Sequence, residues 1–569
     1  MHSSTRKPGI IAIALIMMMG VLSVVSPAQA ADDVTSEDLA KPLRWQTCYE
    51  EESEFSGAAF ECADIRLPLD YDRPFGSTVE VAMVRIPASD PENREGAILL
   101  NPGGPGGSGI DFALGFGPAA GFVLGEEIPA KFDIVGFDPR GIAASSPVRC
   151  FSNLDRAFEH SPPVAFPLTA FEEALFEKSD RELAKACRRW PQARRIGQHV
   201  STANVARDMD VIRASMGDEQ LNFLGLSYGT YLGTVYANLF PERVRSVVVD
   251  GVLDPVAWIN LDAEIPFSTA LKSDVGAADT LQEFFTQCDA AMPGNCALAP
   301  NSEERFDAIA ESLREAPVEF VDPGTGEVFF VSYQDVIGTT LSILYSAFDY
   351  AFLAFILADL ESVIEGAEGA SLSAESLAFA PEPYQNFAEG FPAVACSDSS
   401  NPTSYQAWSD AGNAAEAENG YFGQLWTWAS SPCALWPFQD RDRYVGPFTA
   451  ETANPVLVIG NFYDPATRYE GAEAVRSLLP NSALLSVDVP GHTSLGLSFC
   501  AGFVTGQYLL DPAVASVIDG ETCPAEFNAF DVVAPPPPDE VGGLDADATS
   551  ELMSVRRTIM EEVAGAPSR

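Results

Sequence analysis

The stretch Q-L-N-F-L-G-L-S-Y-G-T-Y-L-G, residues 220–233, decides the fold. A short apolar run enters G-L-S-Y-G, and the helix-like segment T-Y-L-G-T-V-Y-A-N-L-F follows, so we predict a strand, a sharp turn and a helix. Such a turn holds its central residue, Ser227, in strained geometry with the hydroxyl exposed above the sheet. Gly225 and Gly229 lack Cβ atoms, which lets the two arms of the turn approach closely. G-x-S-x-G also occurs by chance in structural turns, but its strand–turn–helix context favours a nucleophile.

A serine that transfers acyl groups needs a base to take its proton and a carboxylate to orient that base. Only His492, in the segment G-H-T-S, follows a predicted strand and lies downstream of a suitable aspartate. The other histidines are His2 in the leader and His160 and His199 before the elbow. The base is therefore predicted to be His492.

The acid is predicted to be Asp464, in the loop directly after the predicted strand 456–459. Asp488 and Asp440 are alternatives, but Asp488 lies within the final predicted strand and Asp440 lies in a helical region. The chain order Ser227, Asp464, His492 is the nucleophile–acid–base order of the α/β-hydrolase fold.

A glycine-rich loop, N-P-G-G-P-G-G-S-G at 101–109, follows the predicted strand 97–100. No G-K-[ST] follows it, which argues against a nucleotide-binding loop. We expect the first half of an oxyanion hole here, with the N–H of Gly104 as donor and that of Gly103 as second choice, because Pro105 has no N–H. The N–H of Tyr228, directly after the nucleophile, is the other expected donor.

Strand-like and helix-like segments alternate up to residue 255. Within this part, we expect Asp138 and Arg140 to hold the turn F-D-P-R-G by pairing with each other or with nearby backbone. From about 256 to 450 the pattern is helical and rich in aromatic residues, and strands then resume. This predicts an α/β-hydrolase fold, with a mostly parallel central sheet and an inserted, mainly helical cap domain. The predicted parts are a signal peptide (1–30), the first part of the core (31–255), the cap (256–450), the second part of the core (451–530), and a Pro-rich linker and tail (531–569).

The formal net charge of -48 and the sequence pI of about 4.2 disfavour nucleic acid as a partner, because an acidic surface repels phosphate backbones. No C-x-x-C pair suggests a zinc site. We expect neither a metal nor another cofactor, and EDTA should not inhibit. The long apolar stretch 336–360 contains Asp349, which favours a buried cap helix over a membrane span.

The N-terminus predicts an export signal, because Arg6 and Lys7 precede the apolar run 9–25 and A-Q-A follows at 28–30. We expect Sec-type cleavage after Ala30, a secreted or periplasmic protein and no stable membrane anchor. Ten cysteines in an exported chain predict disulfides, and we expect sequential pairing. The expected pairs are Cys48–Cys62, Cys150–Cys187, Cys288–Cys296, Cys396–Cys433 and Cys500–Cys523.

Taken together, N-P-G-G-P-G-G-S-G, F-D-P-R-G, G-L-S-Y-G-T-Y-L-G, G-N-F-Y-D-P-A-T and G-H-T-S resemble the secreted tripeptidyl aminopeptidases. These are relatives of prolyl aminopeptidase among the α/β-hydrolase serine peptidases, and the resemblance runs from about 43 to 525. It implies an exopeptidase that removes short peptides, tripeptides above all, from free N-termini, with Ser227, Asp464 and His492 as triad. Pro102 replaces the histidine of the prolyl aminopeptidase motif H-G-G-P-G, which argues against a simple proline iminopeptidase.

An aminopeptidase must neutralise the α-amino group of its substrate, so a buried carboxylate should face the nucleophile. Asp398 is a candidate, with a structural hydrogen-bonding role as an equal alternative. Two other functions stay open. An esterase or other small-molecule acyl hydrolase would use the same triad. A non-catalytic binding protein on this scaffold is disfavoured by the complete triad and glycine loop.

Overall fold

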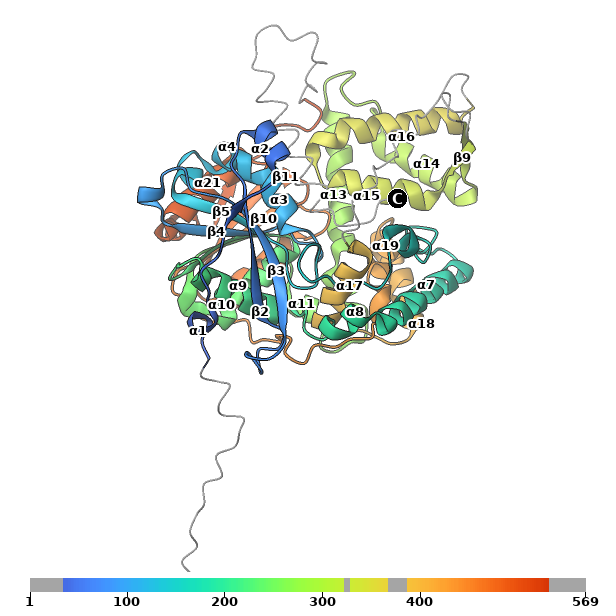
Figure 1. Cartoon of the computed structure of the whole chain (residues 1–569). Coiled ribbons are helices and arrows are strands. Elements are labelled where there is room, and N and C mark those ends of the chain that lie inside the picture. The colour runs from blue at the N-terminus through green and yellow to red at the C-terminus, as the bar shows by residue number, and fades with distance from the viewer. Residues whose placement is uncertain (1–33, 322–327, 367–385, 532–569) are drawn as a thin grey trace, which may run out of the picture.

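Ten strands form one sheet in the order β1-β2-β3-β5-β4-β6-β7-β10-β11-β12 (Figure 1). The structure, a computed structural model, describes residues 34–321, 328–366 and 386–531, so the predicted signal peptide and nearly all of the predicted tail lie outside the described residues. Every pair from β5 to β12 is parallel, whereas β1–β2, β2–β3 and β3–β5 are antiparallel. The expected α/β-hydrolase fold is confirmed. The strands are β1 (Gln46–Thr47), β2 (Glu61–Pro68), β3 (Thr78–Ile86), β4 (Gly96–Asn101), β5 (Phe132–Phe137), β6 (Leu221–Leu226), β7 (Val244–Asp250), β10 (Val456–Tyr463), β11 (Ser482–Pro490) and β12 (Glu521–Cys523).

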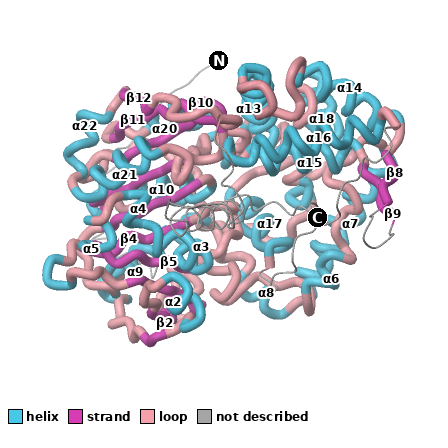
Figure 2. The backbone as a smooth tube through the Cα atoms, turned by 90° about the horizontal axis from the view of Figure 1, so that it is seen from above, coloured by secondary structure: helices cyan, strands magenta, loops and turns pink. Residues whose placement is uncertain are grey.

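Helices cover both faces of this sheet, which explains why every residue of β4, β5 and β6 is buried. One face packs against α9, α10 and α20, and the other packs against α3 and α21 (Figure 2). The antiparallel β3 instead alternates over its first part, with Val79, Val81 and Met83 buried. The helices outside the cap are α1 (Ser36–Leu39), α2 (Glu50–Ser56), α3 (Gly109–Phe116), α4 (Ala120–Leu124), α5 (Glu127–Lys131), α6 (Leu154–Phe158), α7 (Ala170–Arg189), α8 (Pro191–Ile196), α9 (Thr202–Ser215), α10 (Tyr228–Leu239), α20 (Tyr469–Leu478), α21 (Phe499–Leu510) and α22 (Ala515–Ile518).

The chain between β7 and β10 adds no strand to the large sheet in its described part, and it builds a mainly helical layer with its own core (Figure 1). Its helix α18 also packs against α7, which precedes the elbow, so the helical layer includes residues from before position 256. The elements of this insertion are α11 (Pro255–Ile259), α12 (Phe267–Leu271), α13 (Ser273–Ala290), α14 (Ser302–Glu315), the hairpin β8 (Val318–Val321) and β9 (Val328–Val331), α15 (Tyr333–Leu344), α16 (Tyr350–Ile364), α17 (Phe387–Asp398), α18 (Tyr405–Asn419) and α19 (Gly423–Trp428).

The long apolar stretch of the cap is broken into two helices. α15 ends at Leu344, a short 3-10 turn covers Ala347–Asp349, and α16 begins at Tyr350. Both helices bury apolar side chains in the core of the cap. Within the described residues, no helix has the length and apolar character needed to cross a membrane.

All ten cysteines form disulfides, and the pairing is the sequential one that we expected. Cys150–Cys187 joins the loop after β5 to α7, and Cys396–Cys433 joins α17 to the turn after α19. Each bridge closes a loop of the chain, which reduces the conformational freedom of the unfolded state. Five disulfides fit a protein that matures in an oxidising compartment.

Asp138 and Arg140 hold the turn after β5, but they do not pair with each other. The carboxylate of Asp138 accepts bonds from Ser108 Oγ (2.6 Å) and from the N–H groups of Ile110 and Ala144. The buried guanidinium of Arg140 donates to Asp208 (Nε to Oδ2, 2.6 Å) and to backbone carbonyls. The expected backbone contacts are confirmed, and the alternative of a direct pair is wrong.

Replacing Arg140 with methionine is expected to lower the free energy of unfolding by about 3–5 kcal/mol, because it leaves the buried Asp208 carboxylate without its ion partner. Chemical denaturation of the purified variant measures this change. Arg66→Met is the control, since Arg66 is 74% exposed in its pair with Glu80 and should cost no more than about 1 kcal/mol. Equal, small losses in both variants would contradict this interpretation of the Arg140 contact.

Candidate active site

Ser227 lies on the tight turn between β6 and α10, with φ of 55° and ψ of -123°. A non-glycine residue rarely adopts this conformation, so the surrounding contacts must impose it. A Cβ at Gly225 would lie 2.4 Å from the carbonyl oxygen of Gly229, and one at Gly229 would lie 2.7 Å from that of Asn101. Both flanking glycines are therefore required, and the turn has the geometry that the sequence predicts.

His492 and Asp464 are in direct contact. His492 Nδ1 lies 2.9 Å from Oδ1 and 3.0 Å from Oδ2 of Asp464, and both side chains are 1% exposed or less. The carboxylate also accepts bonds from the N–H groups of Ala466, Thr467 and Thr493 and from the Thr467 hydroxyl. These donors fix the carboxylate, which in turn orients the imidazole. With Nδ1 bonded to Asp464, Nε2 is the nitrogen left to accept a proton, and it is buried without a hydrogen-bond partner in the described part of the chain.

The parallel register brings these residues to one edge of the sheet. Ser227, Asp250, Asp464 and His492 follow or end β6, β7, β10 and β11, which are neighbours in this order. Asp250 connects the turn that carries Ser227 with the loop that carries His492. Its carbonyl accepts the Ser227 N–H at 3.0 Å, and its buried carboxylate accepts the N–H and hydroxyl of Ser494 and the N–H of Leu495. Burial raises the pKa of Asp250 to about 6.

The glycine loop lies against the elbow. A Cβ at Gly103 would lie 2.5 Å from the carbonyl oxygen of Leu226 and 2.9 Å from the Tyr228 nitrogen. Gly103 and Gly104 have φ values of 103° and 101°, which favour glycine. Among the described residues, the N–H groups of Gly103 and Gly104 donate to no protein acceptor. The loop therefore has free donors beside the Tyr228 N–H, and the assignment of Gly104 as the donor stays a prediction.

Asp398 is fully buried at the end of α17. Its carboxylate accepts bonds from the N–H (2.9 Å) and hydroxyl (2.6 Å) of Thr202, and the Thr202 hydroxyl also contacts the Tyr228 hydroxyl. The structure therefore connects Asp398 to Tyr228 through Thr202. Burial raises the pKa of Asp398 to about 7.

This raised pKa predicts a pH-dependent stability. The folded protein holds the Asp398 proton more tightly than the unfolded chain does. The protonated side chain therefore contributes to the free energy of unfolding below the ordinary pKa of 3.8, and this contribution is lost as the pH rises through about 7. Asp398→Asn removes this loss, so its melting temperature relative to the native protein should increase from about pH 4 to pH 8. Asp488→Asn, on the partly exposed side of β11, is the control. A difference that does not change with pH would contradict the prediction.

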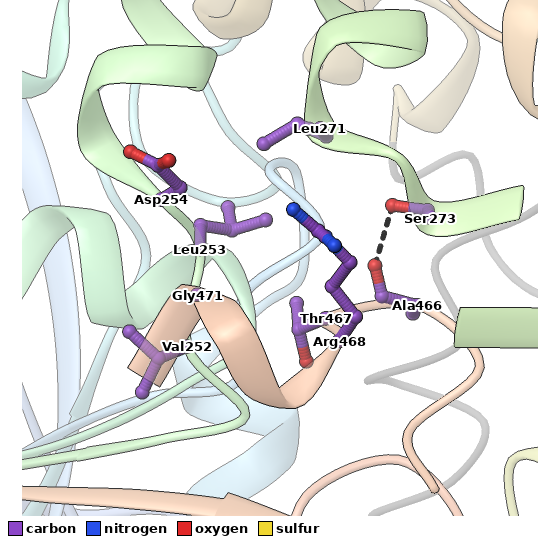
Figure 3. A pocket seen from close by; sticks show the side chains of 9 residues that line it. All are labelled: Val252, Leu253, Asp254, Leu271, Ser273, Ala466, Thr467, Arg468 and Gly471. Atoms are coloured by element: carbon purple, nitrogen blue, oxygen red, sulfur yellow. Dashed lines mark hydrogen bonds between the residues drawn. The ribbon is translucent and has the colours of Figure 1, made fainter. Parts of the chain in front are cut away.

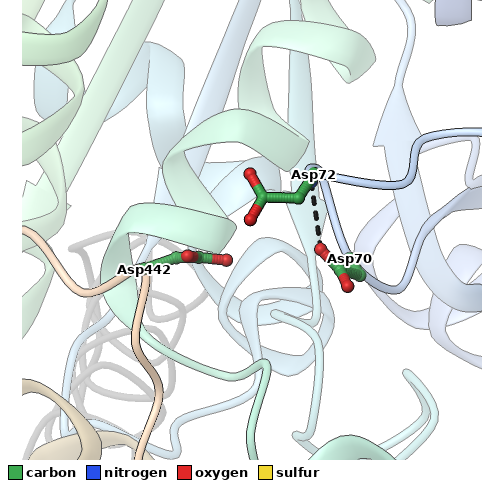
Figure 4. Close-up of side chains that lie close together, drawn as sticks. All are labelled: Asp70, Asp72 and Asp442. Carbon is green, nitrogen blue, oxygen red and sulfur yellow. Dashed lines mark hydrogen bonds between the residues drawn. The ribbon is translucent and has the colours of Figure 1, made fainter. Parts of the chain in front are cut away.

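Three carboxylates, those of Asp70, Asp72 and Asp442, have oxygens within 4.8 Å of one another (Figure 4). Asp70 already accepts a bond from Arg73 Nε at 2.8 Å and one from the Asp72 N–H at 3.0 Å. Exposed acidic groups often gather on a chain of this charge, so we assign the cluster no metal-binding role. That EDTA should not inhibit stays a prediction.

A pocket lies beside the loop that carries Asp464 (Figure 3). Arg468 points into it, and neither Ser227 nor His492 lines it, so it is not where a substrate would meet the nucleophile. Its lining residues are Val252, Leu253, Asp254, Leu271, Ser273, Ala466, Thr467, Arg468 and Gly471.

Three residues that contact the candidate triad or its loops were not predicted from the sequence. They are Asp250, Thr467 and Tyr345, whose ring lies beside His492. Asp250 ends the strand after the elbow, and Thr467 lies three residues after Asp464, so both were within reach of a local argument. Tyr345 lies in the helical insertion, where no local pattern marks it.

Comparison with known proteins finds two matching families. Residues 96–273 match the family described as alpha/beta hydrolase fold, and residues 419–523 match the family described as TAP-like protein. A protein named Tripeptidyl aminopeptidase from Streptomyces lividans is 28% identical over 489 residues, which cover 84% of each chain. Serine protease Hip1 from Mycobacterium tuberculosis is 28% identical over 90% of this chain and 95% of its own. Carboxylesterase B, also from M. tuberculosis, is 31% identical over 83% of this chain and 88% of its own.

Proposed function

Because this chain belongs to the tripeptidyl aminopeptidase-like family of α/β-hydrolases, we propose that it is a serine exopeptidase that releases short peptides, tripeptides above all, from free N-termini. The observation that carries the proposal is the Asp464–His492 contact at the sheet edge that also holds the strained Ser227. These contacts support the proposal, because acyl transfer by a serine uses a nucleophile, a base and an acid that orients the base.

The proposed reaction has two halves. Ser227 Oγ attacks the scissile carbonyl while His492 Nε2 takes its proton, and the N–H groups of Gly104 and Tyr228 stabilise the oxyanion. The imidazolium then protonates the leaving amine, which departs and leaves an acyl-enzyme on Ser227. Water, deprotonated by His492, attacks this ester and releases the short peptide, and Ser227 regains its proton.

Capture of the substrate amine needs a carboxylate that is free to face it. Both oxygens of Asp398 accept bonds from Thr202, and the side chain is fully buried. These contacts favour the structural role for Asp398, and the proposed reaction does not depend on it as the amine site.

An esterase is the second candidate, favoured by the 31% identity to a protein named Carboxylesterase B. The catalytic residues proposed here serve ester and amide substrates alike. We also propose that the chain is exported, which the five disulfides support and which the predicted signal peptide would achieve.

The deciding experiment gives the purified mature protein three substrates: a free tripeptidyl p-nitroanilide, its N-acetylated form and a p-nitrophenyl ester, each also tested with Ser227→Ala. We expect cleavage of the free peptide and not of the blocked one. Equal cleavage of both would exclude an aminopeptidase, and hydrolysis of the ester alone would assign the chain to the esterases. Cleavage unaffected by Ser227→Ala would reject the reaction altogether.

A further inference from the structure

The loop that carries His492 is paired with a segment of the cap. Tyr345 and Ser346 follow α15, and Ser346 forms an antiparallel bridge with Gly491. The His492 N–H donates to the Tyr345 carbonyl at 2.8 Å. A main-chain segment from the insertion therefore holds the backbone of the proposed base on one side.

The side chain of Tyr345 also contacts the imidazole. The ring centroids of Tyr345 and His492 lie 4.8 Å apart, with an interplanar angle of 71°. Gly491 permits this approach, because its φ is 127° and a Cβ there would lie 2.8 Å from the Tyr345 carbonyl oxygen. Tyr345 is 6% exposed, so the ring is enclosed rather than resting on the surface.

Asp464 alone does not fully fix the orientation of the His492 ring. Asp464 engages His492 at one atom, Nδ1, around which an imidazole can still pivot. Nε2 has no partner in the described part of the chain. The Tyr345 ring fills space beside the imidazole and thus limits that pivot, which keeps Nε2 directed as the reaction requires.

The anchor of Tyr345 lies in the cap. Leu344, Tyr345, Ala347 and Tyr350 belong to an apolar core built mainly by α13–α16, which also includes Ala466 and is separate from the two cores that cover the sheet. Tyr345 therefore belongs to this core and also contacts the His492 ring. Opening of the cap at this point would also remove the acceptor of the His492 N–H.

We propose that Tyr345 is a positioning residue for His492, and that the cap, through it, controls the rate of the chemical step as well as enclosing the substrate. This inference rests on the proposed function, because it takes His492 as the base. It predicts that loss of the Tyr345 ring lowers kcat and leaves KM nearly unchanged, because the proposed role of the ring is to orient the base and not to bind substrate.

The test compares variants by steady-state kinetics and by the rate at which a fluorophosphonate labels Ser227, which needs no knowledge of the natural substrate. Tyr345→Ala is expected to lower kcat and the labelling rate by about 10- to 100-fold, the range caused by a small misplacement of a reacting group. Tyr345→Leu restores much of the volume without the ring and is expected to show a smaller loss of the same kind. Tyr345→Phe keeps the ring and should stay within about twofold of the native protein.

Tyr350→Ala is the matched control, because Tyr350 is a fully buried tyrosine of the same core that contacts Phe284 and Phe530 instead of His492. Tyr350→Ala should lower the melting temperature as Tyr345→Ala does, but a fluorophosphonate should label its Ser227 at the rate seen in the native protein. The inference is overturned if Tyr345→Ala labels like the native protein, if Tyr350→Ala loses as much, or if KM alone changes. Failure of the proposed function looks different, because the native protein itself would then not react at Ser227.

Discussion

Replacing Ser227 with alanine is expected to lower kcat by about 10⁶-fold for any substrate that the native protein hydrolyses, and to abolish labelling by a fluorophosphonate. The alcohol oxygen is the only atom lost, and without it no acyl-enzyme forms. The main-chain contacts of the turn, from the Ser227 N–H to Asp250 and from Thr230 to the Ser227 carbonyl, do not use this oxygen. The variant should therefore fold and melt like the native protein.

Ser246→Ala is the matched control for the loss of a buried hydroxyl. Ser246 lies on β7, and its Oγ donates to Asn222 Oδ1 at 2.7 Å. Its replacement should cost about 1 kcal/mol of stability and leave kcat unchanged. Retention of activity in Ser227→Ala, measured on protein free of native enzyme, would show that the nucleophile lies elsewhere.

Replacing Asp464 with asparagine is expected to lower kcat by about 10⁴-fold. Both carboxylate oxygens accept bonds, from Ala466 and Thr467 at Oδ1 and from Thr467 and Thr493 at Oδ2. In asparagine, the NH₂ group at either position would face hydrogen-bond donors. This disrupts the hydrogen bonds that keep a proton on His492 Nδ1. With the proton on Nε2 instead, the imidazole has no lone pair to offer Ser227.

Steady-state kinetics and the fluorophosphonate labelling rate measure this loss, and a thermal melt establishes that the variant is folded. Asp488→Asn is the control, since Asp488 lies two residues before the end of β11, in the same strand that leads to His492. It removes one carboxylate near the site and should keep the native kcat. An equal loss in the two variants, or no loss in Asp464→Asn, would take the acid role from Asp464.

The parts of the candidate site that depend on residues close in the sequence could be predicted from the sequence. Ser227 could be predicted because a strand, two obligatory glycines and a helix all lie within a few residues of it, and the strained turn is a property of that segment. Asp464 and His492 could be predicted because each follows an apolar strand, and parallel strands place such loops at one edge of the sheet. Sequential disulfides could be predicted because short loops bring cysteines together first.

Partners that are distant in the chain could not be predicted in this way. Asp138 and Arg140 are close in sequence, yet the turn directs one to Ser108 and the other to Asp208, because a buried charge binds whichever complementary group the packing places beside it. Asp398 illustrates the same limit, since the sequence left a substrate-binding role and a structural role equally open, and only the fold shows that its carboxylate binds Thr202.

The sequence by itself thus determined the sheet, the insertion in it and the three residues of the candidate triad, because periodicity and turn chemistry act over short stretches of chain. Only the tertiary structure decided how the base is held. Asp250 reaches Ser494, and Tyr345 of the cap reaches His492, across separations at which no pattern in the chain relates one residue to the other. Such contacts arise when separate elements pack together, and packing depends on the shapes of whole surfaces rather than on the order of residues.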